Sequence, residues 1–324
     1  MKRLPVASPA YQYIEKSFKE WLQALGYSWQ AVYYMPIQIR GLLNYLETQN
    51  KTELADITNE AIKGYYYCGL KQRKNHMKNA GTLSNEHLNK NLQALRKFTE
   101  YLRQTGKLQI PVLNIKQEAI IGNKPTVLTE EEIMLLYRAT EKPPEKIRYA
   151  RPLETCEALA MRDRAMLVIF YGCGLRRNEG YHLNITDISL ENALLHVTKG
   201  KGYKERLVPI SKKGTQNITA YLYDARPMLI RDNKEDAFFI SSNDGKRLGG
   251  QMLMKCLQAL ALRTNDTGLQ QKEIGLHTLR HSIATHLLAH GMSLEKIKDF
   301  LGHSSLESTQ IYAHLINEQD GQVQ

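Results

Sequence analysis

The chain has 324 residues, with 44 Lys+Arg against 33 Asp+Glu and a formal net charge of +11. A chain of this length is expected to form two domains, each with its own hydrophobic core. Its 42% hydrophobic and 24% charged residues are typical of a globular protein and exclude collagen-like, low-complexity and disordered chains. The longest apolar stretch, Ala165–Leu175, is too short to span a membrane and no signal-peptide core follows the N-terminus, so we expect a cytoplasmic protein.

Residues 1–110 are expected to form a small helical domain that carries most of the positive charge. Apolar spacing and helix breakers predict helices near Tyr11–Leu25, Met35–Glu47, Thr58–Met77 and Asn85–Arg103. The last helix would place a core stripe on one side, formed by Leu88, Leu92, Leu95, Phe98 and Leu102. Residues 1–125 hold 18 Lys+Arg and 9 Asp+Glu, a net charge of +9 that leaves only +2 of the total +11 for the remainder.

The basic residues of this first domain are candidates for contact with a polyanion. The sequence pI is about 9.3, which is compatible with nucleic-acid binding. A solvated basic face without a partner is the alternative. The residues that we predict to bind are Arg73, Lys74, Lys78, Arg96 and Arg103.

Residues 111–125 read as a linker, because Pro111, Gly122 and Pro125 interrupt a stretch with few periodic apolar positions. Residues 126–324 are predicted to form the second domain, which opens with a capping box of Thr129 and Glu132. The strand pattern is confined to Asp187–Leu190, Ala193–Thr198 and Lys204–Ile210. Helices are expected near 162–172, 215–230, 249–263, 278–290, 294–301 and 306–316. The predicted fold is mainly α with a small antiparallel β-sheet.

Several familiar sites are missing from the sequence. There is no G-x-x-x-x-G-K-[ST] loop, and the glycines around Cys173 do not complete a dinucleotide-binding fingerprint. The four cysteines lie far apart without a C-x-x-C pair, which favours reduced thiols. His277, His281, His286 and His290 divide between two faces of a helix without a carboxylate. We therefore expect no metal and no cofactor.

The C-terminal third contains short polar motifs whose combined chemistry fits attack on a phosphodiester. The motifs are Gly174-Leu175-Arg176-Arg177-Asn178-Glu179, Lys199-Gly200-Lys201-Gly202, His277-Thr278-Leu279-Arg280-His281, Leu301-Gly302-His303 and Tyr312. Two guanidinium groups can hold the non-bridging oxygens of a phosphorane-like transition state without a metal ion. A tyrosine hydroxyl can serve as nucleophile, and a lysine of lowered pKa can protonate the leaving alkoxide.

In this order the motifs resemble the tyrosine recombinase/integrase family, in its phage-integrase/Xer-like two-domain form without an arm-binding domain. The resemblance covers nearly the whole chain and implies a helical, SAM-like core-binding domain followed by a mixed α/β catalytic domain. The implied catalytic residues are Arg176, Lys201, His277, Arg280, His303 and Tyr312, with Glu179 in support of Arg176. Arg177-Asn178 departs from the apolar or small pair often found there, and His281 is given no catalytic role.

The resemblance further implies how these residues act. Arg176 and Arg280 would stabilise the scissile phosphate, Lys201 would protonate the leaving oxygen, and His303 would donate to a phosphate oxygen. His277 would assist proton transfer at Tyr312, and Glu179 would orient Arg176. The product of attack would be a 3′-phosphotyrosine, and the partner would be duplex DNA carrying specific sites.

The resemblance leaves the biological role open. It implies a homotetramer on DNA, with a dimer at each site, at work in the nucleoid. We favour recombination for a mobile genetic element, with an Xer-like dimer resolvase of chromosomes or plasmids, or a DNA invertase, as alternatives. A catalytically silent DNA-binding regulator, and a topoisomerase or telomere resolvase of the same chemistry, are the candidates from other classes.

Overall fold

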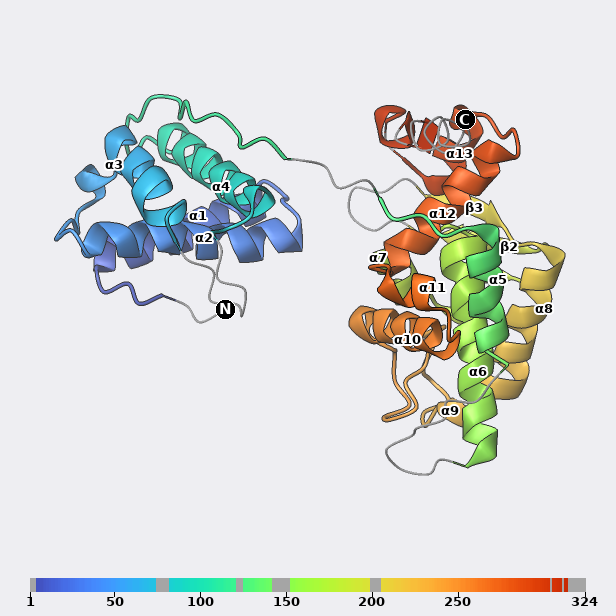
Figure 1. Ribbon diagram of the computed structural model, residues 1–324. Coiled ribbons are helices and arrows are strands. Elements are labelled where there is room, and N and C mark those ends of the chain that lie inside the picture. Colours follow the sequence, from blue (N-terminus) through green and yellow to red (C-terminus); the bar gives the residue numbers. More distant parts are fainter. Residues whose placement is uncertain are drawn as a thin grey trace. The chain divides into compact units, whose positions relative to one another are not determined.

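The computed structural model describes residues 4–73, 82–120, 125–141, 152–198, 205–303, 305–310 and 312–313. The chain divides into two compact units, Met1–Asn123 and Lys124–Gln324 (Figure 1). Both units are mainly helical, and the second contains a small antiparallel sheet, which confirms the predicted fold class. Of the helices in the described ranges, none combines the length and hydropathy that a membrane span requires.

In its described residues, the first unit consists of α-helices with short helical segments between them. The elements are α1 (Pro9–Ala24), α2 (Trp29–Glu47), η1 (Leu54–Asp56), α3 (Asn59–Gly64), η2 (Tyr65–Leu70) and α4 (Asn85–Gln104). Helix α2 begins six residues before the predicted start, because the Ser28 hydroxyl accepts a hydrogen bond from the Ala31 amide and caps the helix there. The predicted third helix is interrupted, since α3 passes into the π-helical η2.

The core stripe predicted for α4 is confirmed, because all five of its apolar residues are at most 4% exposed. Helices α1, α2 and α4 pack against one another, and Phe18 contacts Phe98 edge-on with ring centroids 5.3 Å apart. The segment after α4 also belongs to this core, since Ile110, Leu113 and Ile115 are buried in it. The first half of the stretch read as a linker is therefore packed onto the first unit.

The second unit begins with the predicted capping box. The Thr129 hydroxyl accepts from the Glu132 amide, and the Glu132 carboxylate accepts from the Thr129 amide at 2.9 Å. The helical elements that follow are α5 (Glu130–Ala139), α6 (Leu153–Leu167), η3 (Val168–Gly172), α7 (Arg177–His182), η4 (Ile185–Asp187), α8 (Lys212–Ala220), η5 (Tyr221–Ala225), α9 (Arg226–Leu229), α10 (Gly250–Arg263), α11 (Thr267–Gln271), α12 (Leu276–Ala289) and α13 (Leu294–Leu301).

Two of these helical regions differ from the predicted bounds. The helix expected at 162–172 starts at Leu153 and becomes π-helical at Val168. The helix expected at 215–230 starts at Lys212, because the Ser211 hydroxyl caps the Gly214 amide, and it changes to η5 at Tyr221. The Ser211 cap and the changes of helix type at Val168 and Tyr221 are features that apolar periodicity does not report.

The sheet has the strand order β1-β2-β3 and is antiparallel throughout. Its strands are β1 (Ile188–Ser189), β2 (Leu194–Val197) and β3 (Arg206–Pro209), each shorter than predicted. Leu195 pairs with Val208, and both side chains are fully buried. The predicted turn at 200–203 lies outside the described residues.

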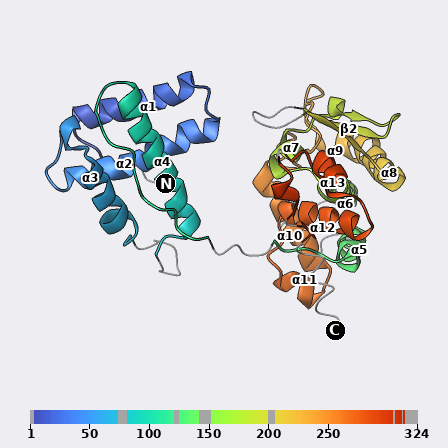
Figure 2. The same ribbon diagram turned by 90° about the horizontal axis from the view of Figure 1, so that it is seen from above.

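Helix α12 is the central element of the second unit. It packs against η3, α10 and α13, and α13 in turn packs against β3 (Figures 1 and 2). Helices α6 and α8 lie side by side and cover the same core (Figure 1). This packing brings the start of α7, the start of β3, the first turns of α12 and the end of α13 to one place.

Candidate active site

A carboxylate surrounded by three arginines forms the centre of the site. Glu179 lies on the first turn of α7, where its carboxylate accepts hydrogen bonds from Arg176 Nη1 at 2.8 Å and from the Arg176 amide at 2.8 Å. Arg206 at the start of β3 binds both carboxylate oxygens of Glu179, at 3.1 and 3.0 Å. Arg280 Nη1 lies 3.9 Å from the same carboxylate. Residues that are 27 and 101 positions away from Glu179 in the sequence are thus assembled around it.

The charge of Glu179 is fixed by these neighbours. Burial by itself would raise the pKa of the carboxyl, but the hydrogen bonds and charge of Arg206, followed by those of Arg176, outweigh burial and lower the pKa to about 2. Glu179 is therefore ionised across the neutral pH range. One negative and three positive charges leave an excess of positive charge, which suits a phosphodiester.

The three guanidinium groups share a second anchor, the carbonyl end of α13. Arg206 Nε donates to Phe300 O at 2.9 Å, Arg280 Nη2 donates to Leu301 O at 2.7 Å and Arg176 Nη2 donates to Gly302 O at 3.0 Å. The last carbonyls of a helix have no partner within it and carry a partial negative charge, so cations are favoured there. The end of α13 thereby fixes the positions of the three arginines relative to His303, which follows it in the chain.

Arg280 is the most buried of the three arginines. Its side chain is 3% exposed, and Nη1 donates to Gly174 O at 2.6 Å. Burial, and then the charge of Arg176, lower the pKa of Arg280 to about 9. The guanidinium still carries its charge at neutral pH. Arg176 is more accessible, with 19% of its side chain exposed.

His277 lies on the first turn of α12 and is exposed to solvent. Desolvation by its surroundings, followed by the positive charges of Arg280, Arg177 and Arg176, lowers the pKa of His277. The neutral imidazole that results can accept or donate a proton. His277 therefore lies within the electric field of the arginine cluster, at the part of the site that faces solvent.

His303 and Tyr312 follow α13 and complete the cluster. The two rings stack with centroids 6.3 Å apart, and His303 Nδ1 lies 2.9 Å from the Thr309 hydroxyl. Burial, and then the charges of Arg280 and Arg176, lower the pKa of His303 to about 4. His303 is therefore neutral at pH 7, and it can donate one hydrogen bond without carrying a charge.

Tyr312 is the buried end of this arrangement, with 1% of its surface exposed. Its hydroxyl lies 3.1 Å from His281 Nδ1, and the pKa of His281 is lowered to about 4 by burial and by the charges of His277 and Arg280. Burial raises the pKa of Tyr312, whereas Arg280 and Arg176 oppose that rise. A phenol next to a neutral imidazole and two guanidinium groups has the partners that a positioned nucleophile needs.

The structure therefore brings together Arg176, Glu179, His277, Arg280, His303 and Tyr312, which the motifs had singled out. Lys201 lies outside the described residues. Sequence reasoning missed two members of the cluster, Arg206 and His281. His281 was passed over although it shares a helix face with His277, and nothing in the position of Arg206 along the chain indicates its contact with Glu179.

The predicted DNA-binding residues of the first unit have different surroundings. Arg73 is exposed, whereas Lys74 and Lys78 lie outside the described residues. Arg96 donates to Ile115 O, and Arg103 Nη1 donates to Ile110 O at 3.3 Å. These two guanidinium groups hold the packed segment after α4 against its helix, which is a structural role beside the predicted contact with DNA.

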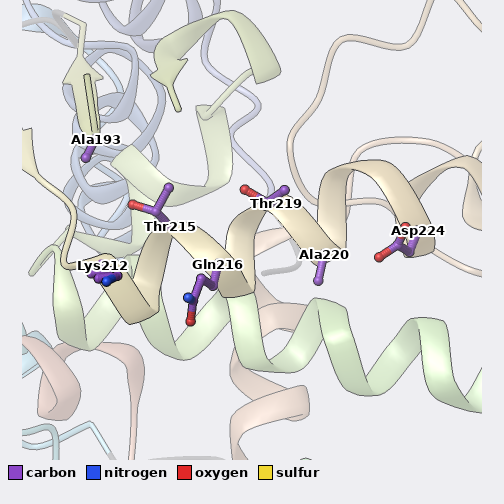
Figure 3. Close-up of a pocket in the computed structure, with 7 residues that line it drawn as sticks. All are labelled: Ala193, Lys212, Thr215, Gln216, Thr219, Ala220 and Asp224. Carbon is purple, nitrogen blue, oxygen red and sulfur yellow. The ribbon is translucent and has the colours of Figure 1, made fainter. Parts of the chain in front are cut away.

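A depression of about 660 Å³ on the second unit is separate from this cluster (Figure 3). Its lining is formed by one face of α8 and η5, together with Ala193 of the turn before β2 (Figure 3). Lys212 and Asp224 are its charged lining residues, and it includes no residue of the arginine cluster. In the described ranges, no three His, Cys, Asp or Glu side chains are grouped in a way that could hold a metal ion.

Known proteins of similar sequence were found for most of the chain. The profile of the phage integrase family matches residues 126–319. The tyrosine recombinase XerD of Lacticaseibacillus casei is 36% identical over 228 residues, which are 70% of this chain and 71% of that protein. The tyrosine recombinase XerD of Oceanobacillus iheyensis is 32% identical over 276 residues, 84% of this chain and 83% of that protein.

Solved structures of similar fold include two with DNA. The XerH site-specific recombinase bound to difH substrate has a TM-score of 0.67 at 21% identity, over 96% of this chain and 83% of that one. The Tn1549 transposon integrase in complex with transposon right end DNA has a TM-score of 0.66 at 16% identity, over 92% and 94%. At these identities the likeness establishes a common fold.

The resemblance carried by the motifs is thus confirmed by sequence and by fold. The family profile covers more than half of the chain, and relatives above 30% identity are matched over more than two thirds of their own length. This chain belongs to the phage integrase family and is a tyrosine-type site-specific recombinase.

Proposed function

We propose that this recombinase cuts and rejoins duplex DNA through a 3′-phosphotyrosine formed at Tyr312. The observation that carries the proposal is the position of the Tyr312 hydroxyl, 3.1 Å from His281 Nδ1 and within the field of Arg176 and Arg280. No metal or nucleotide is needed, because the phosphodiester bond energy is kept in the covalent intermediate.

The proposed residues act at three places in the reaction: the nucleophile, the phosphate and the leaving group. The Tyr312 oxygen attacks the scissile phosphorus and loses its proton with the help of His277, while the bond from phosphorus to the 5′ oxygen breaks. Arg176 and Arg280 bind the non-bridging oxygens, where charge builds up in the transition state, and His303 donates a hydrogen bond to one of them. Lys201 gives the proton that the leaving 5′ oxygen takes up.

Strand exchange is the reverse of cleavage. A 5′ hydroxyl from the partner DNA attacks the phosphotyrosine, the bond from phosphorus to the tyrosine oxygen breaks, and Tyr312 recovers its proton. Because Tyr312 is buried, the segment that carries it has to shift before a phosphate can reach its hydroxyl. We propose that DNA binding drives this shift.

The partner we propose is duplex DNA with specific recombination sites, bound at each site by two copies and exchanged within a homotetramer at the nucleoid. The basic first unit supplies phosphate contacts, including Arg73, Lys74, Lys78, Arg96 and Arg103. Support for DNA as the partner comes from the net charge of +11 and from the DNA-bound proteins of the same fold. Contacts of this kind fix position on the duplex, whereas base contacts specify its sequence.

Covalent trapping tests the chemistry. Purified wild type and Tyr312→Phe would be mixed with nicked duplexes that tile the DNA around the chain's own gene and then separated on denaturing gels. We expect an adduct with wild type and none with Tyr312→Phe. Tyr223→Phe, which changes a tyrosine that is 68% exposed in the same unit, is the control and keeps the adduct. An adduct that survives Tyr312→Phe would show that another residue is the nucleophile.

For the biological role, we propose recombination for a mobile genetic element. A second candidate, Xer-like resolution of chromosome or plasmid dimers, is favoured by the names of the curated relatives, which include XerD from several bacteria. The two roles differ in the sites they join. Dimer resolution acts on two identical sites repeated in the same direction, whereas element insertion joins two sites of different sequence.

Plasmids carrying paired sites separate these roles. Once trapping has located one site, the enzyme would be incubated with two kinds of substrate. The first is a plasmid that carries two copies of the site in the same direction. The second is a pair of plasmids, one with the element end and the other with a target sequence. Joining of unlike sites supports the mobile-element role. Efficient deletion between identical copies, without joining of unlike sites, supports the Xer-like role and contradicts the first.

A further inference from the structure

Arg177 is an exposed arginine beside the active site to which the proposed reaction gives no task. It follows Arg176 directly and is the first residue of α7. In the sequence it belongs to the Arg177-Asn178 pair, which departs from the apolar or small residues often found there. Among the residues that the structure describes, the Arg177 guanidinium has no hydrogen-bond or ion-pair partner.

The aliphatic part of Arg177 is held in place by a neighbouring helix. Helices α7 and α10 pack against each other (Figure 1). A Cβ atom on Gly250, at the start of α10, would lie 3.6 Å from Arg177 Cγ and 3.7 Å from Arg177 Cδ. The stem therefore lies against the first turn of α10 while much of the side chain is exposed. A long cationic side chain in this arrangement keeps its charged end available to solvent or to a ligand.

The charge of Arg177 acts on a residue of the site, His277. Burial is the largest cause of the lowered pKa of His277, and the charge of Arg177 comes after that of Arg280 and before that of Arg176. Glu179 acts in the opposite direction. The position of Arg177 next to Arg176 in the chain agrees with this effect. Both observations place Arg177 at the part of the site that faces solvent.

Within the site, no acid is left to balance Arg177. The Glu179 carboxylate is shared by Arg176, Arg206 and Arg280. A DNA duplex, by contrast, presents a phosphate about every 3.4 Å of helix axis along each strand. When the scissile phosphate occupies the site, a phosphate beside it is an anion within reach of Arg177. A guanidinium can bind two oxygens of such a phosphate at once.

We propose that Arg177 is a further DNA-binding residue of the active site, which binds a phosphate next to the scissile one. This role rests on the proposed function. A contact with the backbone does not depend on the base sequence. Because the contact is present before and during cleavage, it contributes to affinity and leaves the rate of the cleavage step nearly unchanged.

The first test measures affinity and its dependence on salt. Arg177→Met removes the charge and keeps the stem, and it would be made in the Tyr312→Phe background so that bound DNA is not cut. With a labelled duplex that carries the site located by trapping, we expect Kd to rise about 5- to 10-fold at about 0.1 M salt. The slope of log K against log salt should become less steep by about one. An unchanged Kd and slope would overturn the proposal.

Two variants serve as controls in the same background. Arg177→Lys keeps a positive charge and should recover most of the salt slope, so a lysine variant as weak as Arg177→Met would contradict an ionic contact. Arg138→Met removes an exposed arginine in the last turn of α5, in the same unit. We expect its Kd to stay close to that of the parent. A loss equal to that of Arg177→Met would show that only the net charge of the unit matters, which contradicts a specific contact.

The second test locates the contact on the DNA. The phosphates on either side of the scissile one would be replaced, one at a time, by neutral methylphosphonates. We expect one of these replacements to weaken binding of the parent but to have no further effect on Arg177→Met, because both changes remove the same contact. If every replacement weakens both proteins equally, Arg177 does not bind a phosphate next to the scissile one.

The third test uses cleavage and separates this proposal from the proposed function. In protein that keeps Tyr312, Arg177→Met at saturating concentration should form the adduct at a rate within about 3-fold of wild type. A much lower rate at saturation would assign Arg177 to the chemical step and contradict a role in binding. If wild type forms no adduct with any duplex, the function proposed for Tyr312 is at fault. If wild type forms the adduct and Arg177→Met binds DNA as tightly as its parent, only the role of Arg177 is wrong.

Discussion

Two neutral histidines contact Tyr312 in a site that otherwise carries strong positive charge: His281 lies at its hydroxyl and His303 stacks on its ring. His281 and His303 have pKa values of about 4, for which burial is the largest cause and neighbouring positive charge adds to it. A neutral imidazole adds no further repulsion to the three arginines. It also leaves one ring nitrogen as an acceptor for Tyr312 and one N–H as a donor.

The lowered histidine pKa values make stability depend on pH in a defined window. In the unfolded chain these histidines take up protons near pH 6.5, whereas in the folded chain they do so only near pH 4. Between these values the unfolded state binds more protons, so the free energy of unfolding falls as pH falls from 6.5 to 4. We expect a loss of about 1 kcal/mol per histidine at pH 5 relative to pH 7.

Denaturant unfolding at pH 7 and pH 5 measures this loss. His303→Gln removes one of the two groups and should reduce the difference between the two pH values. Glu179, with a pKa of about 2, contributes stability that is lost only as pH falls from about 4.5 to 2, below this window. Equal stability of wild type at pH 7 and pH 5 would contradict the lowered pKa values of these half-buried histidines.

The hydrogen bond between Tyr312 and His281 gives a second prediction for single residues. His281→Phe leaves the buried Tyr312 hydroxyl without its acceptor, which costs about 1–3 kcal/mol of unfolding free energy. Tyr312→Phe removes the donor instead. A double-mutant cycle should show that the two losses are not additive, with a coupling of about 1 kcal/mol. Strictly additive losses would show that this hydrogen bond contributes nothing to stability.

At the scale of elements, the ends of helices carry the site. Arg176 precedes α7, and Gly174 just before it has φ of +61° and presents its carbonyl to Arg280. A Cβ atom on Gly174 would meet Leu301 Cδ2 at 2.9 Å and Phe300 Cε1 at 3.0 Å. The close approach of α13 to this turn therefore requires glycine for its size as well as for its backbone angle.

A comparison of two glycines tests this packing. Gly291, after α12, also has a positive φ of +84°, but a Cβ atom at this position would have no neighbour within 4 Å. Gly291→Ala should cost about 1 kcal/mol for backbone strain alone. Gly174→Ala should cost a further 1–3 kcal/mol or so for overpacking and should also slow cleavage. Equal costs in denaturant unfolding would mean that α13 moves away freely.

Much of the element order could be predicted from the sequence, because apolar periodicity and capping motifs are local signals. The Thr129 capping box and the strand regions are where the pattern placed them. Boundaries set by one hydroxyl, such as Ser28 at α2, were missed, and so were the changes to π-helix in η3 and η5. Apolar spacing does not encode a cap or an added residue per turn.

The site was predictable to the extent that its residues stand in recognisable motifs. Arg176, Arg280 and Tyr312 were found in this way, whereas Arg206 was not, because its partners Glu179 and Phe300 are 27 and 94 positions away. Contacts between residues so far apart in the sequence depend on how β3, α7 and α13 pack, so they can be identified only in the folded chain.

At the scale of the whole molecule, charge governs the encounter with DNA. Residues 1–123 form their own compact unit and hold most of the net charge of +11. If 6–10 phosphates are contacted, affinity for a duplex should fall by about 10³-fold or more between 50 and 200 mM salt. Fluorescence anisotropy with a labelled duplex measures the slope. A slope near zero would contradict a partner bound through its phosphates.

The most direct measurement of the central claim is mass spectrometry of the trapped adduct. Cleavage after Lys298 releases a C-terminal peptide whose single tyrosine is Tyr312. We predict that this peptide carries a nucleotide joined through its 3′ phosphate to the Tyr312 oxygen, and that the released strand bears a 5′ hydroxyl. A nucleotide attached elsewhere in the chain, or a 5′-linked nucleotide on Tyr312, would contradict the proposed chemistry.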